Sequence, residues 1–151
     1  MKSHLGDRMM EGAVAGLEAT AAMSAFMWSA QRAGFLREQA PKQVVRRSLD
    51  AVGQPSNGSL LKAISLVAHF GFGGAAGAAY GAVTERLGPD RANVVTGIAF
   101  GLAVWVVTYK VTFPPMHLMP PPERDRPGRA RTMILAHVVY GAVLGGRIGR
   151  R

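Results

Sequence analysis

Three ionisable side chains stand inside apolar stretches of this sequence: Glu18, His69 and His137. An ionisable group within an apolar helix is costly unless it meets a partner, so such residues tend to face the interior of a helix bundle. The two histidines begin the same short pattern, His-x-x-aromatic-Gly-x-x-x-Gly, whose aromatic residue in the second copy is Tyr140. We therefore expect Glu18, His69, His137 and Tyr140 to form one polar cluster within the protein.

Three kinds of chemistry fit such a cluster, and a pocket for a small molecule or a lipid is a fourth interpretation. Glu18 can hydrogen-bond one or both histidines and fix the register of the helices, which is a purely structural role. A charge shared between the carboxylate and the imidazoles would instead respond to pH. His69 and His137, which lie at similar depths in their segments, are also candidate ligands for haem or a metal ion. The sequence has no cysteine and no nucleophile, phosphate-loop or zinc-hydrolase motif, so we expect no enzyme and no dedicated metal site.

Four apolar segments must position these residues. The chain has 151 residues, of which 48% are hydrophobic, and its apolar runs are long enough to suggest helices that cross a bilayer. The fourth run is short, but arginines at its two ends can reach toward the membrane surfaces. We expect an all-α, polytopic membrane four-helix bundle forming a single domain, with spans at about residues 12–30, 63–83, 92–109 and 132–146.

Glycines four residues apart occur in every one of these segments. Small residues at this spacing allow helices in lipid to approach closely, so that van der Waals contact between backbones holds them together. Such glycines can pack helices within one chain or between copies, and we favour packing within the chain. The residues concerned are Gly12, Gly16, Gly73, Gly77, Gly81, Gly97, Gly101, Gly141 and Gly145.

The formal charge of +9 comes from 18 lysines and arginines that lie mainly between the apolar segments. Basic residues confined to the ends of apolar runs indicate membrane boundaries, so we do not expect nucleic acid as a partner. In a four-span arrangement the two long connections share one side of the membrane, and that side carries more Lys and Arg than the other. This bias favours both connections in the cytoplasm and both termini outside.

The two long connections differ in character. In residues 41–52 a proline stands where a helix can begin, and apolar and basic residues fall on different faces, as in a helix that lies at the membrane interface and favours anionic lipids. A solvated linker helix explains the same pattern. Residues 113–129 are rich in proline, so we expect an extended, stiff loop there. This loop is a candidate contact for a partner protein.

The second half of the sequence also resembles a known family. The residues that carry the resemblance are, in chain order, His69, Gly77, Tyr80, Glu85, Pro89, Gly97, Gly101, Trp105, Pro114, Pro115, Leu118, Pro120, Pro121, His137, Tyr140 and Gly141. Over residues 63–146 this resembles the YagU-like group of small bacterial inner-membrane proteins, whereas the first span and the termini match less specifically. The resemblance implies an inner-membrane protein of uncharacterised function and supplies no catalytic residues.

Together these features predict a small inner-membrane protein that acts as a binding or accessory protein. The alternative is a proton-responsive or haem- or metal-binding redox protein centred on Glu18, His69 and His137. Expected partners are membrane lipids, and either another membrane protein or further copies of the chain. The sequence names no ligand.

Overall fold

The computed structural model describes residues 2–54, 58–125 and 127–149, and every regular element within these ranges is helical. The all-α prediction is therefore confirmed for this part of the chain. Each predicted apolar segment falls largely on one long helix, and the predicted helix 41–52 appears as the short helix α2. The elements are α1 (Lys2–Arg32), α2 (Ala40–Ala51), α3 (Gly58–Leu87), η1 (Pro89–Arg91), α4 (Val94–Trp105), η2 (Val106–Thr112), η3 (Pro122–Arg124) and α5 (Pro127–Ile148).

The helices extend beyond the apolar runs that predicted them. Hydropathy changes where charged residues begin, whereas backbone hydrogen bonding continues through arginine, a good helix former. α5 begins at Pro127, because proline suits the first turn of a helix, and its 22 residues make it about 33 Å long. The prediction of an extended loop at residues 113–129 is thus wrong in part. Its last residues belong to α5, and turns and the short helix η3 occupy much of the rest, while residue 126 lies outside the described residues.

Local signals fix the ends of the connection between α3 and α4. Gly88 has a φ of +112°, a conformation that side-chain-bearing residues rarely adopt, and α3 ends immediately before it. At the start of α4 the Asn93 side chain accepts hydrogen bonds from the backbone of Val95 and Thr96, and the Thr96 hydroxyl accepts one from the Asn93 backbone. This reciprocal cap sets a sharp, short turn.

α4 continues into a widened helical turn, η2, in which hydrogen bonds join residues five apart. The Phe113 amide donates to the Thr108 carbonyl at 2.9 Å, and the Thr112 hydroxyl donates to the Val107 carbonyl at 2.7 Å. Such π-type turns are rare and are frequent near functional sites. Pro114 and Pro115 follow directly and cannot continue the helix.

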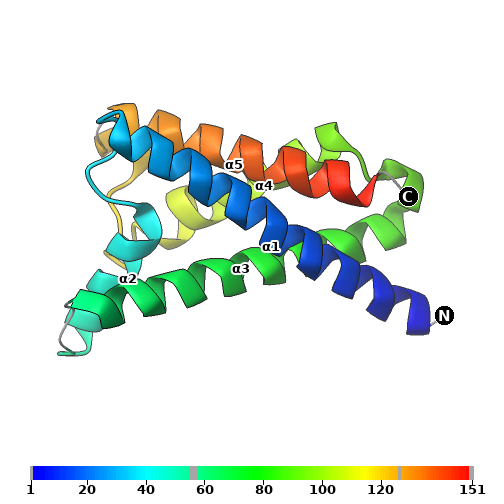
Figure 1. The fold of residues 1–151 in the computed structure, drawn as a ribbon, viewed down its shortest axis with the longest axis horizontal. Helices are drawn as coiled ribbons and strands as arrows, with labels where there is room; N and C mark the ends of the chain where they lie inside the picture. The colour runs from blue at the N-terminus through cyan, green and yellow to red at the C-terminus, as the bar shows by residue number, and fades with distance from the viewer. Residues whose placement is uncertain (1, 55–57, 126, 150–151) are drawn as a thin grey trace.

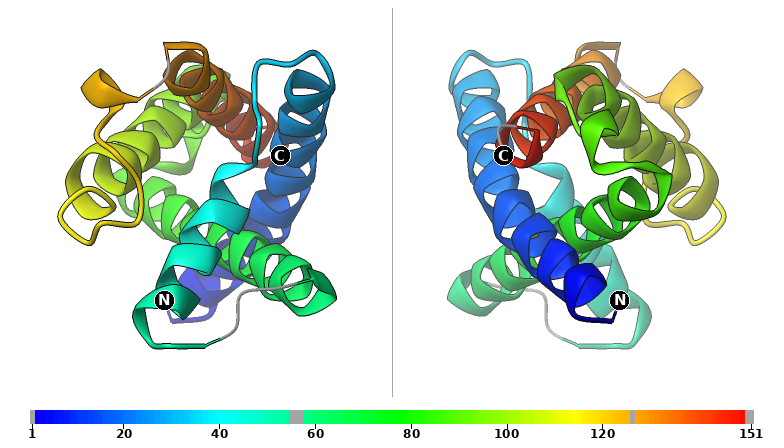
Figure 2. Two further views of the ribbon diagram at one scale, coloured as in Figure 1. Left: turned by 90° about the vertical axis from the view of Figure 1, so that its left-hand side faces the viewer. Right: turned by 90° about the vertical axis from the view of Figure 1, so that its right-hand side faces the viewer.

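The four long helices run back and forth along the molecule, as Figure 1 shows. Both long connections lie at one end, together with α2. The turn between α3 and α4 lies at the other end with the described ends of the chain, and Figure 2 views the bundle from both ends. α3 packs on α1, α1 on α5 and α5 on α4, whereas α3 and α4 touch only near their shared turn. α3 and α4 diverge from that turn.

Glycines lie at the crossing of α1 with α3. A methyl group added at Gly77 would overlap the Gly12 carbonyl and lie 2.7 Å from the Gly16 Cα atom, and one added at Gly16 would overlap the Gly73 carbonyl. Gly81 approaches the backbone of Arg8 in the same way. Only glycine allows two helix backbones to come this close.

The crossing of α4 with α5 repeats this arrangement. A methyl group at Gly97 would overlap the Gly141 carbonyl and lie 2.7 Å from the Gly145 Cα atom, and one at Gly101 would overlap the His137 carbonyl. Every glycine singled out in the sequence therefore lies against a neighbouring helix of the same chain. The two crossings divide the bundle into an α1–α3 half and an α4–α5 half.

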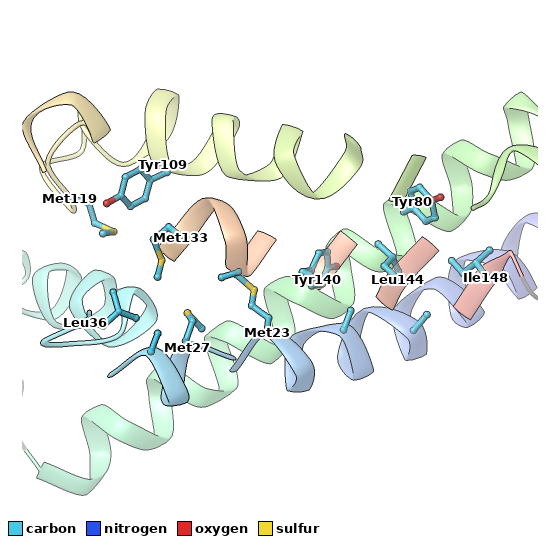
Figure 3. Packing of buried hydrophobic residues seen from close by; sticks show 14 of the residues in the cluster. Met23, Met27, Leu36, Tyr80, Tyr109, Met119, Met133, Tyr140, Leu144 and Ile148 are labelled. Carbon is cyan, nitrogen blue, oxygen red and sulfur yellow. The ribbon is translucent and has the colours of Figure 1, made fainter. Parts of the chain in front are cut away.

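Between these halves runs a narrow core rich in methionine and tyrosine. Figure 3 shows it extending from Leu36 and Met119 at the end with the long connections, past Met27 and Met133, to Tyr80 and Ile148 at the other end. Methionine adapts its shape to irregular gaps between crossing helices. The core is thin because the contacting faces of the helices carry small residues, so the helices lie close together.

Much apolar surface lies outside this core. Two helices, Gly58–Leu87 and Val94–Thr112, are long and apolar enough to cross a membrane, and only 28% and 17% of their most apolar stretches are buried. A core helix of a soluble protein would be mostly buried. Large exposed apolar residues occur along the bundle, among them Val14, Leu17, Leu66, Val67, Phe72, Val83, Val95, Val106, Val107 and Leu135.

Candidate functional site

A cavity of about 280 Å³ lies between the two halves of the bundle, toward the end with the long connections. All four long helices, the π-type turn and α2 contribute to its wall. The lining is largely aliphatic and aromatic, with Met23 and Met27 from α1 and Met133 from α5. A concave, mostly apolar cavity with a few polar groups is the usual form of a small-molecule site.

His137 of α5 is one of these polar groups. Its Nδ1 atom lies 2.8 Å from the Met133 carbonyl oxygen, one turn earlier in the same helix. A carbonyl can only accept a hydrogen bond, so Nδ1 carries the proton. In the neutral ring Nε2 then holds a lone pair, which can accept a hydrogen bond from a ligand or bind a metal ion.

His69 of α3 lines the same cavity as His137. Its Nε2 atom is buried and has no hydrogen-bond partner among the described residues. The ring meets Phe70 edge to face, with centroids 6.1 Å apart. A buried polar atom without a partner costs free energy, and such atoms call for an explanation such as a bound molecule.

Tyr140 is the third predicted member of the cluster, and it also lines the cavity. Its side chain is only 3% exposed, and its hydroxyl donates a hydrogen bond of 2.7 Å to the Gly73 carbonyl of α3. The hydroxyl is therefore engaged with the backbone. Its role in the cavity is to hold α5 against α3 and to supply an aromatic wall.

Glu18, the fourth predicted member, does not join the histidines. Its carboxylate forms an ion pair with Arg147 at the far end of α5, where one nitrogen donates at 2.7 Å. The Glu18 side chain is 41% exposed and lies in a separate surface hollow beside Asp7 and Glu11. The predicted three-way meeting is thus wrong. Thr20 and Met23 of α1 line the cavity and Glu18 does not, because residues two apart on a helix point about 200° away from each other.

The two histidines occupy equivalent places in the two halves. Gly73 and Gly77 follow His69 and pack on Gly16, and Gly141 and Gly145 follow His137 and pack on Gly97 with the same spacing. α1 and α4 run in one direction, and α3 and α5 in the other. The sequence repeat is therefore a structural repeat, and it brings one imidazole from each half to one cavity.

A polar network that sequence reasoning missed closes the cavity at the end with the long connections. Tyr109, which lines the cavity, donates its hydroxyl to the Asp125 carboxylate, and Arg129 Nε donates to the same carboxylate at 2.9 Å. Arg129 also donates to the Gln43 side chain of α2. The network thus joins α2, the proline-rich loop and α5. Asp125 and Arg129 are only four residues apart, but Tyr109 and Gln43 are distant in sequence, so no local pattern marked the network.

α2 forms part of the cavity wall, although the sequence suggested only a surface helix. Pro41, Val44 and Val45 from its apolar face line the cavity, and the helix packs on α3. Arg47, on the opposite face, donates to the His117 carbonyl of the proline-rich loop. The amphipathic pattern was the available signal, but it could not say whether the apolar face meets lipid or protein.

One family matches nearly the whole chain, over residues 6–151: Family of unknown function (DUF6789). The chain belongs to this family. No curated protein and no solved structure matches the chain. The DUF6789 match includes the first helix and its basic connection as well as both histidine repeats, and the YagU-like assignment is not confirmed. Membership of a family of unknown function assigns no activity to the cavity.

Proposed function

We propose that this chain is a four-span membrane protein whose central cavity binds a small, largely apolar molecule through His69 and His137. The observation that carries the proposal is the buried, unpartnered Nε2 atom of His69, which shares an apolar cavity with His137. The apolar wall provides burial of ligand surface, and the two imidazoles provide orientation. A binding or accessory role needs no catalytic group and no metal.

Helix lengths and surface chemistry support four spans. A helix of about 20 residues crosses the hydrocarbon of a bilayer, and α1, α3, α4 with η2, and α5 all reach this length. In water the exposed valines and leucines would be a large apolar patch, whereas in lipid they meet hydrocarbon. The Glu18–Arg147 pair fits this setting, because an arginine near a helix end can reach the interface.

The distribution of charge supports an inner-membrane location with the long connections in the cytoplasm. Basic residues of α2, the proline-rich loop and the start of α5 gather at one end of the bundle. Lys and Arg near span ends are retained on the cytoplasmic side. On this proposal both termini lie outside, and α2 lies at a membrane surface that contains anionic lipid.

Native mass spectrometry of the detergent-purified protein tests ligand binding. We expect a small-molecule adduct on the wild-type protein and its loss in His69→Phe and His137→Leu. His117→Asn is a matched control, because it removes a histidine that lies in the loop outside the cavity lining, at a φ of +56° that asparagine tolerates. A wild-type protein without any adduct, or an adduct equally abundant in the cavity variants, would count against the proposal.

The rival proposal is a haem held by the two imidazoles, which the repeat presents as an equivalent pair. Haem would give the purified protein a Soret absorption band that disappears in either histidine variant. The cavity holds no third candidate metal ligand from His, Cys, Asp or Glu among the described residues. A colourless protein that still carries an adduct would favour the apolar small molecule over haem.

A further inference from the structure

Building on the proposed binding function, we propose that the ligand is a neutral phenol, an apolar aromatic molecule whose hydroxyl group donates a hydrogen bond to the Nε2 atom of His137. Three properties of the cavity lead to this chemical class. They are the polar atoms that can still form a hydrogen bond, the lack of charged residues in the described lining, and the size and composition of the wall.

The hydroxyl groups in the cavity wall have already used their protons. The residues that carry them are Thr20, Thr108, Tyr109 and Tyr140. The two threonines donate to backbone carbonyls four residues earlier, at 2.7 and 2.8 Å. The two tyrosines donate to the Asp125 carboxylate and to the Gly73 carbonyl. Each oxygen can still accept a hydrogen bond, but it has no proton left for a ligand.

His137 provides an imidazole acceptor in the same wall. Its Nδ1 proton is engaged with the Met133 carbonyl, so Nε2 holds the lone pair. The buried side-chain nitrogens that lack a partner among the described residues belong to His69 and Trp105. The Nε2 atom of His137, which has no partner there either, therefore keeps accessible surface. A ligand that binds this atom must bring the proton, as a hydroxyl group does and a ketone or an ether does not.

The lack of charge in the wall restricts the donor further. No Asp, Glu, Lys or Arg is among the described residues that line the cavity. An ammonium group or a carboxylate would therefore be buried there without a counter-charge, which costs much free energy. A phenol is neutral at pH 7, because its hydroxyl group has a pKa of about 10, as in tyrosine.

The rest of the wall favours an aromatic ring over an alkyl chain. Met23, Met27 and Met133 line the cavity, and Figure 3 shows them meeting between α1 and α5. Thioether sulfur makes favourable contacts with aromatic rings, and Phe72 and Phe113 add aromatic surface. A cavity of roughly 150 Å³ holds benzene. The volume of about 280 Å³ therefore suits one ring with a short alkyl substituent.

Isothermal titration calorimetry of the detergent-purified protein tests this inference with matched probes. 4-Butylphenol has the hydroxyl donor, 4-butylanisole keeps the oxygen atom without a donor, and butylbenzene has no oxygen atom. The heat of mixing each probe into protein-free detergent is subtracted. We expect 4-butylphenol to bind about five- to tenfold more tightly than the other two, the effect of one hydrogen bond. This comparison uses the wild-type protein, so it does not depend on the folding of a variant.

Variants then locate the hydrogen bond. His137→Leu should reduce the affinity for 4-butylphenol to that for 4-butylanisole and leave the affinity for 4-butylanisole unchanged, because only the hydroxyl group meets His137. His117→Asn, outside the cavity lining, should change neither affinity. Ala76→Leu, which adds side-chain volume to the wall, should weaken the binding of both probes. Unchanged binding to Ala76→Leu would place the probes outside the cavity and overturn the inference.

The outcomes separate this inference from the proposed function. If 4-butylphenol binds no better than 4-butylanisole while a histidine-dependent adduct persists in native mass spectra, the phenol is overturned and the binding function remains. A preference for 4-butylphenol that survives in His137→Leu would also overturn the inference, because another group would then recognise the hydroxyl. Absence of both probe binding and adduct would overturn both proposals.

Discussion

Tyr140 of α5 and Gly73 of α3 are joined by a hydrogen bond of 2.7 Å, from the tyrosine hydroxyl to the glycine carbonyl. The bond connects one helix of each half of the bundle at the wall of the cavity. It has no counterpart in the other half, where the position equivalent to Tyr140 is Phe72, which has no hydroxyl. The repeat is therefore asymmetric at this position, where Tyr140 is buried and hydrogen-bonded and Phe72 is half exposed.

We predict that Tyr140→Phe destabilises the bundle modestly. The substitution removes the hydroxyl and leaves the aromatic wall, so it should lower the free energy of unfolding by about 1 kcal/mol. Unfolding of the purified protein in mixed micelles measures this. Tyr140→Phe that unfolds like the wild type would mean that the hydroxyl contributes nothing to holding α5 against α3.

Gly77 provides a sharper test of the helix crossing. Gly77→Ala places a methyl group against the Gly12 carbonyl and the Gly16 backbone, so α1 and α3 must separate, at a cost of about 1–3 kcal/mol. Gly71→Ala is the matched control on the same helix, because nothing lies within 4 Å of a methyl group there. Thermal denaturation in detergent should show a large loss for Gly77→Ala. Equal melting of the two variants would contradict the crossing.

Much of this arrangement could be predicted from the sequence, because glycine spacing and apolar runs are local properties. Gly77 and Gly145 could be assigned to helix contacts, and His69 and His137 to one depth, from the repeat alone. The partner of Glu18 could not be predicted in this way. The 3.6-residue period gives several faces of α1 that carry small or apolar residues, and only the packing of α3 and α5 on this helix decides that the face of Ala19 and Met23 is buried while Glu18 meets Arg147.

The Asp125 network shows the same limit more strongly, since it joins Tyr109, Arg129 and Gln43 from three separate elements. We predict that Asp125→Ala is among the more damaging single changes. The Asp125 side chain is nearly fully buried, and its loss leaves the Tyr109 hydroxyl and a largely buried Arg129 without their acceptor, at a cost of about 3 kcal/mol.

The measurement for Asp125→Ala is unfolding in detergent, followed by the fluorescence of Trp105, which stacks on Tyr109. Glu123→Ala is the control, because Glu123 pairs with Lys110 on the exposed side of the same loop. That exposed ion pair lowers the pKa of Glu123 but has little effect on packing. Equal stability of the two variants would show that the buried network does not stabilise the fold.

The orientation of the chain can be tested directly, because the sequence has no cysteine. Met116 lies exposed in the proline-rich loop, and Asp90 lies exposed in the turn between α3 and α4, at the opposite end of the bundle. We predict that a membrane-impermeant maleimide added to intact cells labels Asp90→Cys and leaves Met116→Cys unlabelled until the cells are opened. The reason is the excess of Lys and Arg at the end that contains Met116, which in the proposed topology is the cytoplasmic end. Reversed labelling would invert the topology and place the basic face of α2 outside, whereas labelling of both positions in intact cells would mean that the bundle does not separate two compartments.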